Sequence, residues 1–155
     1  MKFGLFLFVV LTTSVESRWF GYNQTAGAKG ILMCHQQVAS NVAVKLVNEE
    51  RFIDETMSST VSDERGAFSL SGYAQEVTGI DAFVHIYHDC NDHFDFSLDV
   101  PLRLRLRPGI CQRELRIEIP TNYILPGNNG PARIYDLGTI QLAAHHRGNT
   151  HSCFG

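Results

Sequence analysis

Short runs in which apolar and polar residues alternate are the feature that most constrains how this chain of 155 residues can fold. Alternation with a period of two is typical of a β-strand that buries one face, and no window of helical length shows a sustained 3.6-residue period. The expected strands cover residues 42–46, 67–71, 81–88, 114–119 and 134–143. Seven or so strands at intervals of about ten residues predict an all-β fold, built as a sandwich of two sheets.

Turn residues separate these runs. Asp63 and Gly66 stand first and fourth in a type I turn pattern that suits a hairpin. Prolines and glycines between residues 120 and 131 predict a long loop before the last strand. No internal repeat or low-complexity tract interrupts the pattern, so we expect one domain.

The N-terminus has the pattern of a secretory signal peptide. One positive charge precedes an apolar run over residues 5–11, and Val15 and Ser17 occupy positions minus three and minus one of a cut before Arg18. The apolar run is too short to span a bilayer, and the alternative is a buried N-terminal strand. We therefore expect a secreted, extracellular protein with a signal peptide at 1–17, a short flexible leader at 18–27 and the folded domain at 28–155.

The charge balance gives no reason to expect nucleic acid as a partner. Lysine and arginine number 13 against 16 aspartate and glutamate residues, for a net charge of -3 with neutral histidines. Asn23 begins a glycosylation sequon that ends at Thr25. Its position in the expected leader would favour modification.

The four cysteines are Cys34, Cys90, Cys111 and Cys153. An even count in a chain expected to be secreted predicts two disulfides, for which three pairings are possible. Cys90 ends one extended run and Cys111 begins another, so they would meet if those strands were neighbours. We favour this pairing, which leaves Cys34 to join Cys153.

Six stretches of the chain, in this order, resemble the nematode transthyretin-like proteins. They are residues 30–34, NVAVKL at 41–46, SDERGAFSLSG at 62–72, HIYHDCND at 85–92, IPTNYI at 119–124 and YDLGTIQLA at 135–143. The resemblance implies a secreted, disulfide-bonded β-sandwich of the transthyretin (prealbumin) type, with two antiparallel sheets in Greek-key order and about seven to eight strands. Residues 93–110 form a longer segment than this family usually has there.

A histidine-rich segment, VHIYHDCNDH at 84–93, resembles a metal site at first sight. In a strand, His88 and Cys90 share one face while His85 and Tyr87 share the other, so a zinc site would need ligands from both faces. It would also need a thiolate, which an oxidised Cys90 cannot supply. We expect no metal and no cofactor, interpret the segment as architecture around a disulfide, and retain His85 and His88 as candidate ligand-binding residues.

A second candidate site lies at PLRLRLRPG, residues 101–109, where leucines alternate with Arg103, Arg105 and Arg107. If the segment is extended, the guanidinium groups line one face at intervals of about 6.6 Å. Guanidinium groups match phosphate and carboxylate oxygens, so the three could hold a lipid headgroup or a sulfated glycan in peripheral contact with a membrane. The structural alternative is an edge strand whose charges prevent pairing with other chains.

We expect no catalysis. Hydroxyisourate hydrolases resemble transthyretin and end in Tyr-Arg-Gly-Ser, whereas the nearest match here, at residues 146–149, lacks the tyrosine and the serine. We therefore expect a non-enzymatic extracellular binding protein for a hydrophobic small molecule, an anionic lipid or an extracellular protein. The alternatives are a transthyretin-related hydrolase and a structural protein of the matrix or cuticle, and the oligomeric state stays open.

Overall fold

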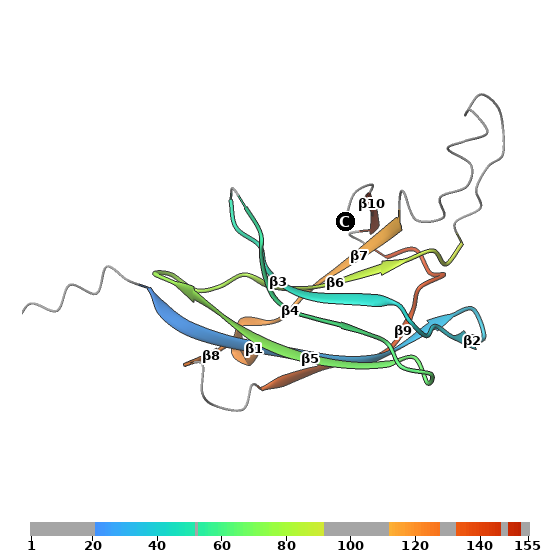
Figure 1. Ribbon diagram of the computed structural model, residues 1–155, viewed down its shortest axis with the longest axis horizontal. Coiled ribbons are helices and arrows are strands. Elements are labelled where there is room, and N and C mark those ends of the chain that lie inside the picture. The colour runs from blue at the N-terminus through green and yellow to red at the C-terminus, as the bar shows by residue number, and fades with distance from the viewer. Residues whose placement is uncertain (1–20, 52, 92–111, 128–132, 147–148, 153–155) are drawn as a thin grey trace, which may run out of the picture.

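Two β-sheets lie face to face in the computed structural model, which describes residues 21–51, 53–91, 112–127, 133–146 and 149–152 (Figure 1). One sheet has β1 at its centre, with β2, β5, β8 and β9 paired to it, and the other has the order β10-β7-β6-β3-β4. The strands are β1 (Tyr22–Cys34), β2 (Gln37–Val38), β3 (Ala43–Asn48), β4 (Glu55–Val61), β5 (Ala67–Glu76), β6 (Ala82–His88), β7 (Gln112–Glu118), β8 (Leu125–Pro126), β9 (Ile134–Gln141) and β10 (Asn149–Ser152). The predicted β-sandwich is confirmed.

The alternating runs identified in the sequence fall on β3, β5, β6, β7 and β9. Their inward residues form one core with those of β1, and Leu32, Leu46 and Ile86 have no exposed surface. Burial of one such side chain contributes about 2 kcal/mol. The apolar positions of the period-two pattern are therefore the residues on the inner face of each sheet.

The flexible leader expected at 18–27 is wrong for its second half, because β1 begins at Tyr22 and pairs with β5 from there on. Gln24 is buried, donates from Nε2 to the carbonyl of Thr78 at 2.6 Å and accepts from the amide of Ile80 at 3.2 Å. Hydrogen bonds from a polar side chain thus anchor a segment whose composition is typical of a loop. The glycosylation sequon therefore does not lie in a flexible leader, since Asn23 belongs to a paired strand and Thr25 is buried.

A turn closed by a hydrogen bond between the first and fourth residues is present at Asp63, but the expected hairpin is wrong. The amide of Gly66 donates to the carbonyl of Asp63 at 2.9 Å, and Gly66 has a φ of 73°. However, β4 belongs to one sheet and β5 to the other, so the turn joins the two layers. Gly72 lets the edges of the layers approach, because a Cβ there would lie 2.6 Å from the carbonyl oxygen of Met57 in β4.

One helix is described, a 3-10 turn at Thr121–Tyr123 inside the expected loop. Among the residues described, no helix has the length and apolar character that a membrane crossing requires.

Candidate functional site

The disulfide joins Cys34 to Cys90, with a Cα–Cα distance of 5.9 Å. The favoured pairing of Cys90 with Cys111 and of Cys34 with Cys153 is therefore wrong. Cys90 has the same strand parity as His88, and both are buried toward the interior. A half-cystine on the inner face reaches the opposite sheet rather than the neighbouring strand, and the bond ties the end of β1 to the end of β6. Cys111 and Cys153 lie outside the described residues.

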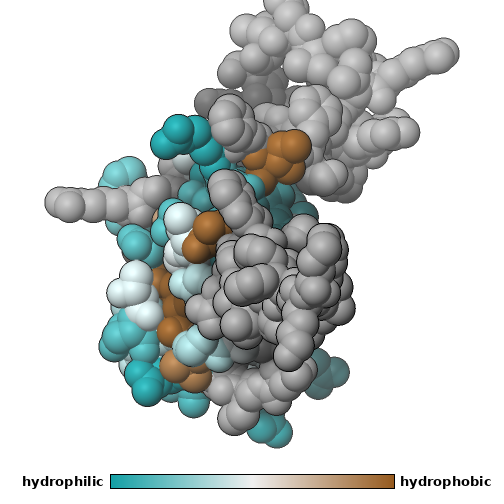
Figure 2. All heavy atoms as spheres, turned by 90° about the vertical axis from the view of Figure 1, so that its left-hand side faces the viewer, coloured by the Kyte–Doolittle hydropathy of each residue, from teal (hydrophilic) through white to brown (hydrophobic). Residues whose placement is uncertain are grey.

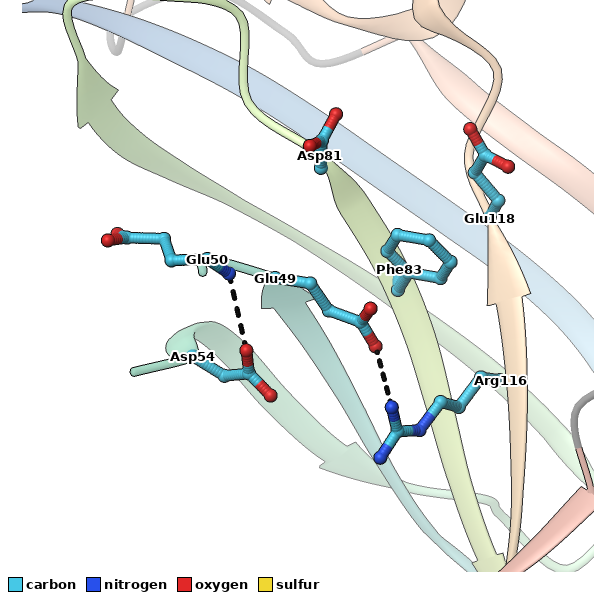
Figure 3. A pocket seen from close by; sticks show the side chains of 7 residues that line it. All are labelled: Glu49, Glu50, Asp54, Asp81, Phe83, Arg116 and Glu118. Atoms are coloured by element: carbon cyan, nitrogen blue, oxygen red, sulfur yellow. Dashed lines mark hydrogen bonds and ion pairs between the residues drawn. The ribbon is translucent and has the colours of Figure 1, made fainter. Parts of the chain in front are cut away.

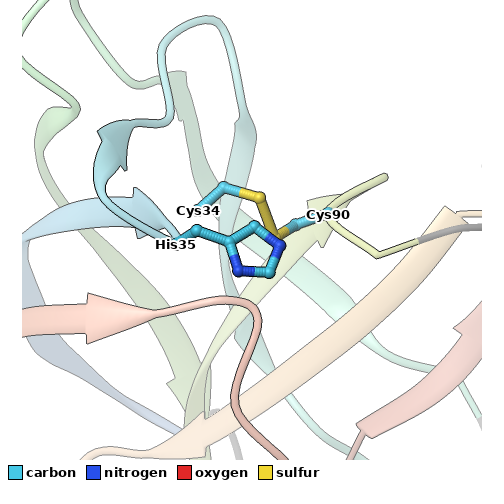
Figure 4. Close-up of side chains that lie close together, drawn as sticks. All are labelled: Cys34, His35 and Cys90. Atoms are coloured by element: carbon cyan, nitrogen blue, oxygen red, sulfur yellow. A yellow bond between two sulfur atoms is a disulfide. The ribbon is translucent and has the colours of Figure 1, made fainter.

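His35 stands beside this bond (Figure 4). One of its ring nitrogens and the two sulfur atoms lie within 4.8 Å of one another, and Nε2 is 2.7 Å from Oδ1 of Asn91. Both sulfur atoms are bonded to each other in the disulfide, so the cluster offers no thiolate to a metal ion.

The two candidate histidines lie on opposite faces of β6, as the strand parity predicts. His88 is buried toward the interior with 3% of its surface exposed. His85 is equally buried, yet it lies on the outer face beside Tyr87, 6.4 Å between ring centroids. Neighbouring polar side chains, rather than the other sheet, therefore cover His85.

Four ionisable side chains meet in a ring, which we call the charge ring: Glu49, His85, Glu114 and Arg116. His85 Nε2 lies 2.9 Å from Oε1 of Glu49, and its Nδ1 lies 2.9 Å from Oε1 of Glu114. Arg116 approaches the same two oxygen atoms, with its NH1 3.3 Å from Glu49 and its Nε 3.2 Å from Glu114. Each carboxylate thus contacts two nitrogen groups, across β6, β7 and the end of β3.

Burial in the charge ring is uneven. The side chains of His85 and Glu114 are 4% and 5% exposed, whereas those of Glu49 and Arg116 are 25% and 40% exposed. Partial burial opposes the charge of Arg116, but the hydrogen bond and charge of Glu114 and the charge of Glu49 outweigh it and raise the pKa of the guanidinium. Partial burial and the adjoining Glu114 carboxylate also raise the pKa of Tyr87.

The exposed half of the charge ring forms one wall of a pocket of about 530 Å³, which we call the acidic pocket (Figure 3). Its lining consists of five carboxylates, one cation and one aromatic ring: Glu49, Glu50, Asp54, Asp81, Glu118, Arg116 and Phe83. Partial desolvation and the carboxylates of Glu76, Glu55 and Asp54 raise the pKa of Glu50, as expected where negative charges crowd. Within the described part of the chain, the only ion pair of a lining carboxylate with lysine or arginine joins Glu49 to Arg116.

A buried asparagine positions the loops around the acidic pocket. Asn48, 1% exposed, donates from Nδ2 to Glu76 Oε1 at 2.9 Å and accepts from the amide of Asp81 at 3.0 Å. The amide of Glu49 in turn donates to the carbonyl of Asp81 at 2.9 Å. The end of β3, the end of β5 and the start of β6 are thereby fixed relative to one another.

Two large apolar residues that are neighbours in the sequence of Asp54 and Glu76 are exposed. Figure 2 views the end of the sandwich where β1 begins and shows hydrophobic side chains among hydrophilic ones. Ile53, from the loop between β3 and β4, is 79% exposed, and Val77, after β5, is 66% exposed.

Of the residues proposed from the sequence, the structure brings His85 into this site and places His88 in the core. Arg103, Arg105 and Arg107 lie outside the described residues. Sequence reasoning missed Asn48 and the pocket carboxylates, because they come from loops and strand ends far apart in the chain. The sequence feature that came closest to indicating an acidic site was the pair Glu49-Glu50, directly after an alternating strand.

Comparisons with a family model and with individual proteins identify the same family. A model of the transthyretin-like family, TTR-52, matches residues 29–120. Three Caenorhabditis elegans proteins are similar over most of their length. Transthyretin-like protein 2 is 32% identical and the match covers 98% of this chain and 97% of that protein, transthyretin-like protein 5 is 38% identical (94% and 96%), and transthyretin-like protein 33 is 31% identical (85% and 83%).

Among solved structures, a 9R-lipoxygenase from Cyanothece PCC8801 matches 77% of this chain and 16% of its own, at 15% identity and a TM-score of 0.39. At that score the likeness says nothing about function. The family match and the relatives agree with the sandwich and with the motifs read from the sequence. The chain belongs to the transthyretin-like family.

Proposed function

We propose that this protein is a secreted, non-enzymatic binding protein that holds a cationic group of its ligand or partner in the acidic pocket. The observation that carries the proposal is the lining of the pocket, in which five carboxylates face one arginine. Opposite charges at short range attract most strongly where the surroundings exclude water, as in a concave site. The carboxylates make an anionic ligand a poor match for this pocket, in contrast to the expectation from the sequence.

The size and spacing of the lining favour an organic cation over a metal ion. Among the described residues, the only group of three potential metal ligands that converge within 4.8 Å is Cys34, His35 and Cys90. The carboxylates of the acidic pocket are thus spread along its walls. A guanidinium or an alkylammonium group matches such a lining, and Arg116 on Glu49 is an internal example of this contact.

The surroundings of His85 support a role without catalysis. A general base needs a free lone pair within reach of a substrate, but both ring nitrogens of His85 face carboxylate oxygens at 2.9 Å. The exposed apolar residues Ile53 and Val77 support a ligand with apolar as well as cationic groups.

Calorimetric titration with agmatine, which carries a guanidinium and an amine, tests the proposal. We expect saturable binding to the native protein and a loss of about tenfold in affinity when Asp81→Asn and Glu118→Gln are combined, because two charges are removed from the lining. Glu64→Gln, an exposed carboxylate in the turn between β4 and β5, is the matched control and should leave binding unchanged. Absence of binding, or equal affinity in the pocket variant and the control, would overturn the proposal.

The alternating arginines favour a second proposal, recognition of anionic lipid headgroups by residues 101–109. Each basic residue near an anionic membrane contributes about 1 kcal/mol, so three give a weak anchor. Sedimentation with vesicles of phosphatidylserine and phosphatidylcholine tests it. Binding should disappear when Arg103, Arg105 and Arg107 are replaced by glutamine, and equal retention of both proteins would refute it.

A further inference from the structure

We propose that Phe83 determines which cations the acidic pocket accepts, because the face of its ring favours a weakly hydrated group such as a guanidinium over a primary ammonium. This inference rests on the proposed function and names the ligand class of the same site. It begins from the lining of the pocket, in which Phe83 is the only aromatic residue among those described.

The position of Phe83 places its ring among the carboxylates of the acidic pocket. Phe83 is partly buried and lies on the outer face of β6. Its register partner on β7 is Glu118, and residues directly opposite on antiparallel strands share a face. Asp81 comes two residues earlier in the chain. Figure 3 shows the ring beside Glu49 and Glu118, so the charged lining encloses an apolar surface.

A cation already lies over another aromatic ring of this face. Lys45 on β3 places its ammonium 5.1 Å from the ring centroid of Tyr87. This contact is attractive because the face of an aromatic ring carries partial negative charge. Tyr87 and Phe83 are four residues apart on β6, so both belong to the outer face, and Phe83 is the one that lines the pocket. The contact that we assign to Phe83 and a ligand therefore has a counterpart within the protein.

The spread of the carboxylates disfavours a compact, strongly hydrated cation. A primary ammonium is a point charge with three donors, and each donor that leaves water needs a new acceptor. Within the described part of the chain, no three carboxylates bring their oxygen atoms within 4.8 Å of one another. A guanidinium is planar, more weakly hydrated and able to stack on an aromatic face. The pocket should therefore distinguish between cations of equal charge.

Calorimetric titration with agmatine and with cadaverine measures this preference, because the two ligands have equal charge and similar length but cadaverine has an amine in place of the guanidinium. We expect the native protein to bind agmatine about fivefold more tightly. Phe83→Leu keeps an apolar side chain without a ring, and the ratio of the two affinities should fall toward one. Phe83→Tyr keeps the ring and should keep the preference. Tyr73→Leu, at an exposed aromatic residue of the other sheet, is the matched control and should retain the native ratio.

NMR of the native protein with agmatine is a readout that does not depend on the folding of a variant. We expect a nuclear Overhauser effect between the ring protons of Phe83 and the methylene group next to the guanidinium. Its absence overturns the inference, as does an equal ratio of affinities in Phe83→Leu and the native protein, and both results leave the proposed function standing. Absence of agmatine binding overturns the inference and the proposed function together.

Discussion

Both faces of β6 (Ala82–His88) contain buried side chains, but the side chains are buried for different reasons. On the inner face, Ala82, Val84 and Ile86 pack against the apolar side chains of the opposite sheet. On the outer face, His85 is buried by polar neighbours: Glu49 and Tyr87 hydrogen-bond to its ring, and a carboxylate oxygen of Glu114 lies 2.9 Å from its Nδ1. Loss of an inner side chain creates a cavity, whereas loss of one partner in the charge ring leaves a buried charge uncompensated. The comparison teaches that burial alone does not say which force holds a residue in place.

The largest effect is expected from a break in the charge ring. Glu114→Ala leaves His85 and Arg116 with one carboxylate between them and should lower the free energy of unfolding by about 3–5 kcal/mol. Urea denaturation measures this change. Glu118→Gln, on the same face of β7 but exposed, is the control and should change stability little. A loss below about 1 kcal/mol in Glu114→Ala would show that the ring contributes no more than an exposed ion pair.

A second disulfide, between Cys111 and Cys153, is expected to raise the free energy of unfolding by about 4 kcal/mol, because it would join cysteines roughly 40 residues apart. The register of β10 on β7 ends at Ser152 opposite Gln112, one residue from Cys153 and Cys111. Of the three possible pairings, the bond between Cys34 and Cys90 leaves only this one. Peptide mapping without reduction should recover a fragment linking Cys111 to Cys153, and recovery of either as a free thiol would contradict the prediction.

Shortening a side chain on the inner face should lower the free energy of unfolding somewhat less than breaking the charge ring does. Leu46→Ala removes a fully buried side chain and should lower the free energy of unfolding by about 3 kcal/mol, because the sandwich closes the cavity only in part. Ser69→Ala, at an exposed position on β5, is the control for the experiment. If Leu46→Ala lowers the free energy of unfolding by more than Glu114→Ala does, then the apolar contacts of the inner face contribute more to stability than the charge ring of the outer face.

The smallest effect is expected at an exposed ion pair, which contrasts with the buried ring. A hydrogen bond from the amide of Gly138 at 2.9 Å and the Lys29 ammonium at 3.2 Å lower the pKa of Asp136. A carboxyl whose pKa is depressed by folding stabilises the protein above its unfolded pKa, and this stability is lost as the pH falls through the folded value. Asp136→Asn should therefore slightly reduce the change in melting temperature between pH 5 and pH 2. An equal slope in both proteins would mean that the contact does not persist in solution.

The sequence predicted those parts of the fold that depend on local alternation. β3, β5, β6, β7 and β9 were found because their inner faces are apolar and their outer faces are polar. β4, with the sequence ETMSSTV, and β10 were missed, because short polar edge strands are determined by their partners rather than by their own pattern. β1 was also absent from the expected strands, and its first half is held by hydrogen bonds of the buried Gln24 rather than by an alternating pattern.

The candidate site was predicted only at His85, and its chemistry was not predicted. Strand parity placed His85 and His88 on opposite faces correctly, but parity does not identify which face is covered. The same uncertainty misled the disulfide pairing, because Cys90 was assumed to meet a neighbour within its sheet. Glu49, Glu114 and Arg116 come together through the register of three strands, which no single segment encodes.

The short β10 strand also limits how the sheet can grow. Residues Asn149–Ser152 take up the outer edge of β7, so the main-chain groups there are already satisfied from within the chain. A partner strand that paired directly with β7 would first have to displace these four residues, and the edge that remains on this side is β10 itself, only four residues long. The C-terminal segment thereby replaces the seven-residue edge of β7 with a much shorter one, and truncation before residue 149 would expose the longer edge to pairing with other chains.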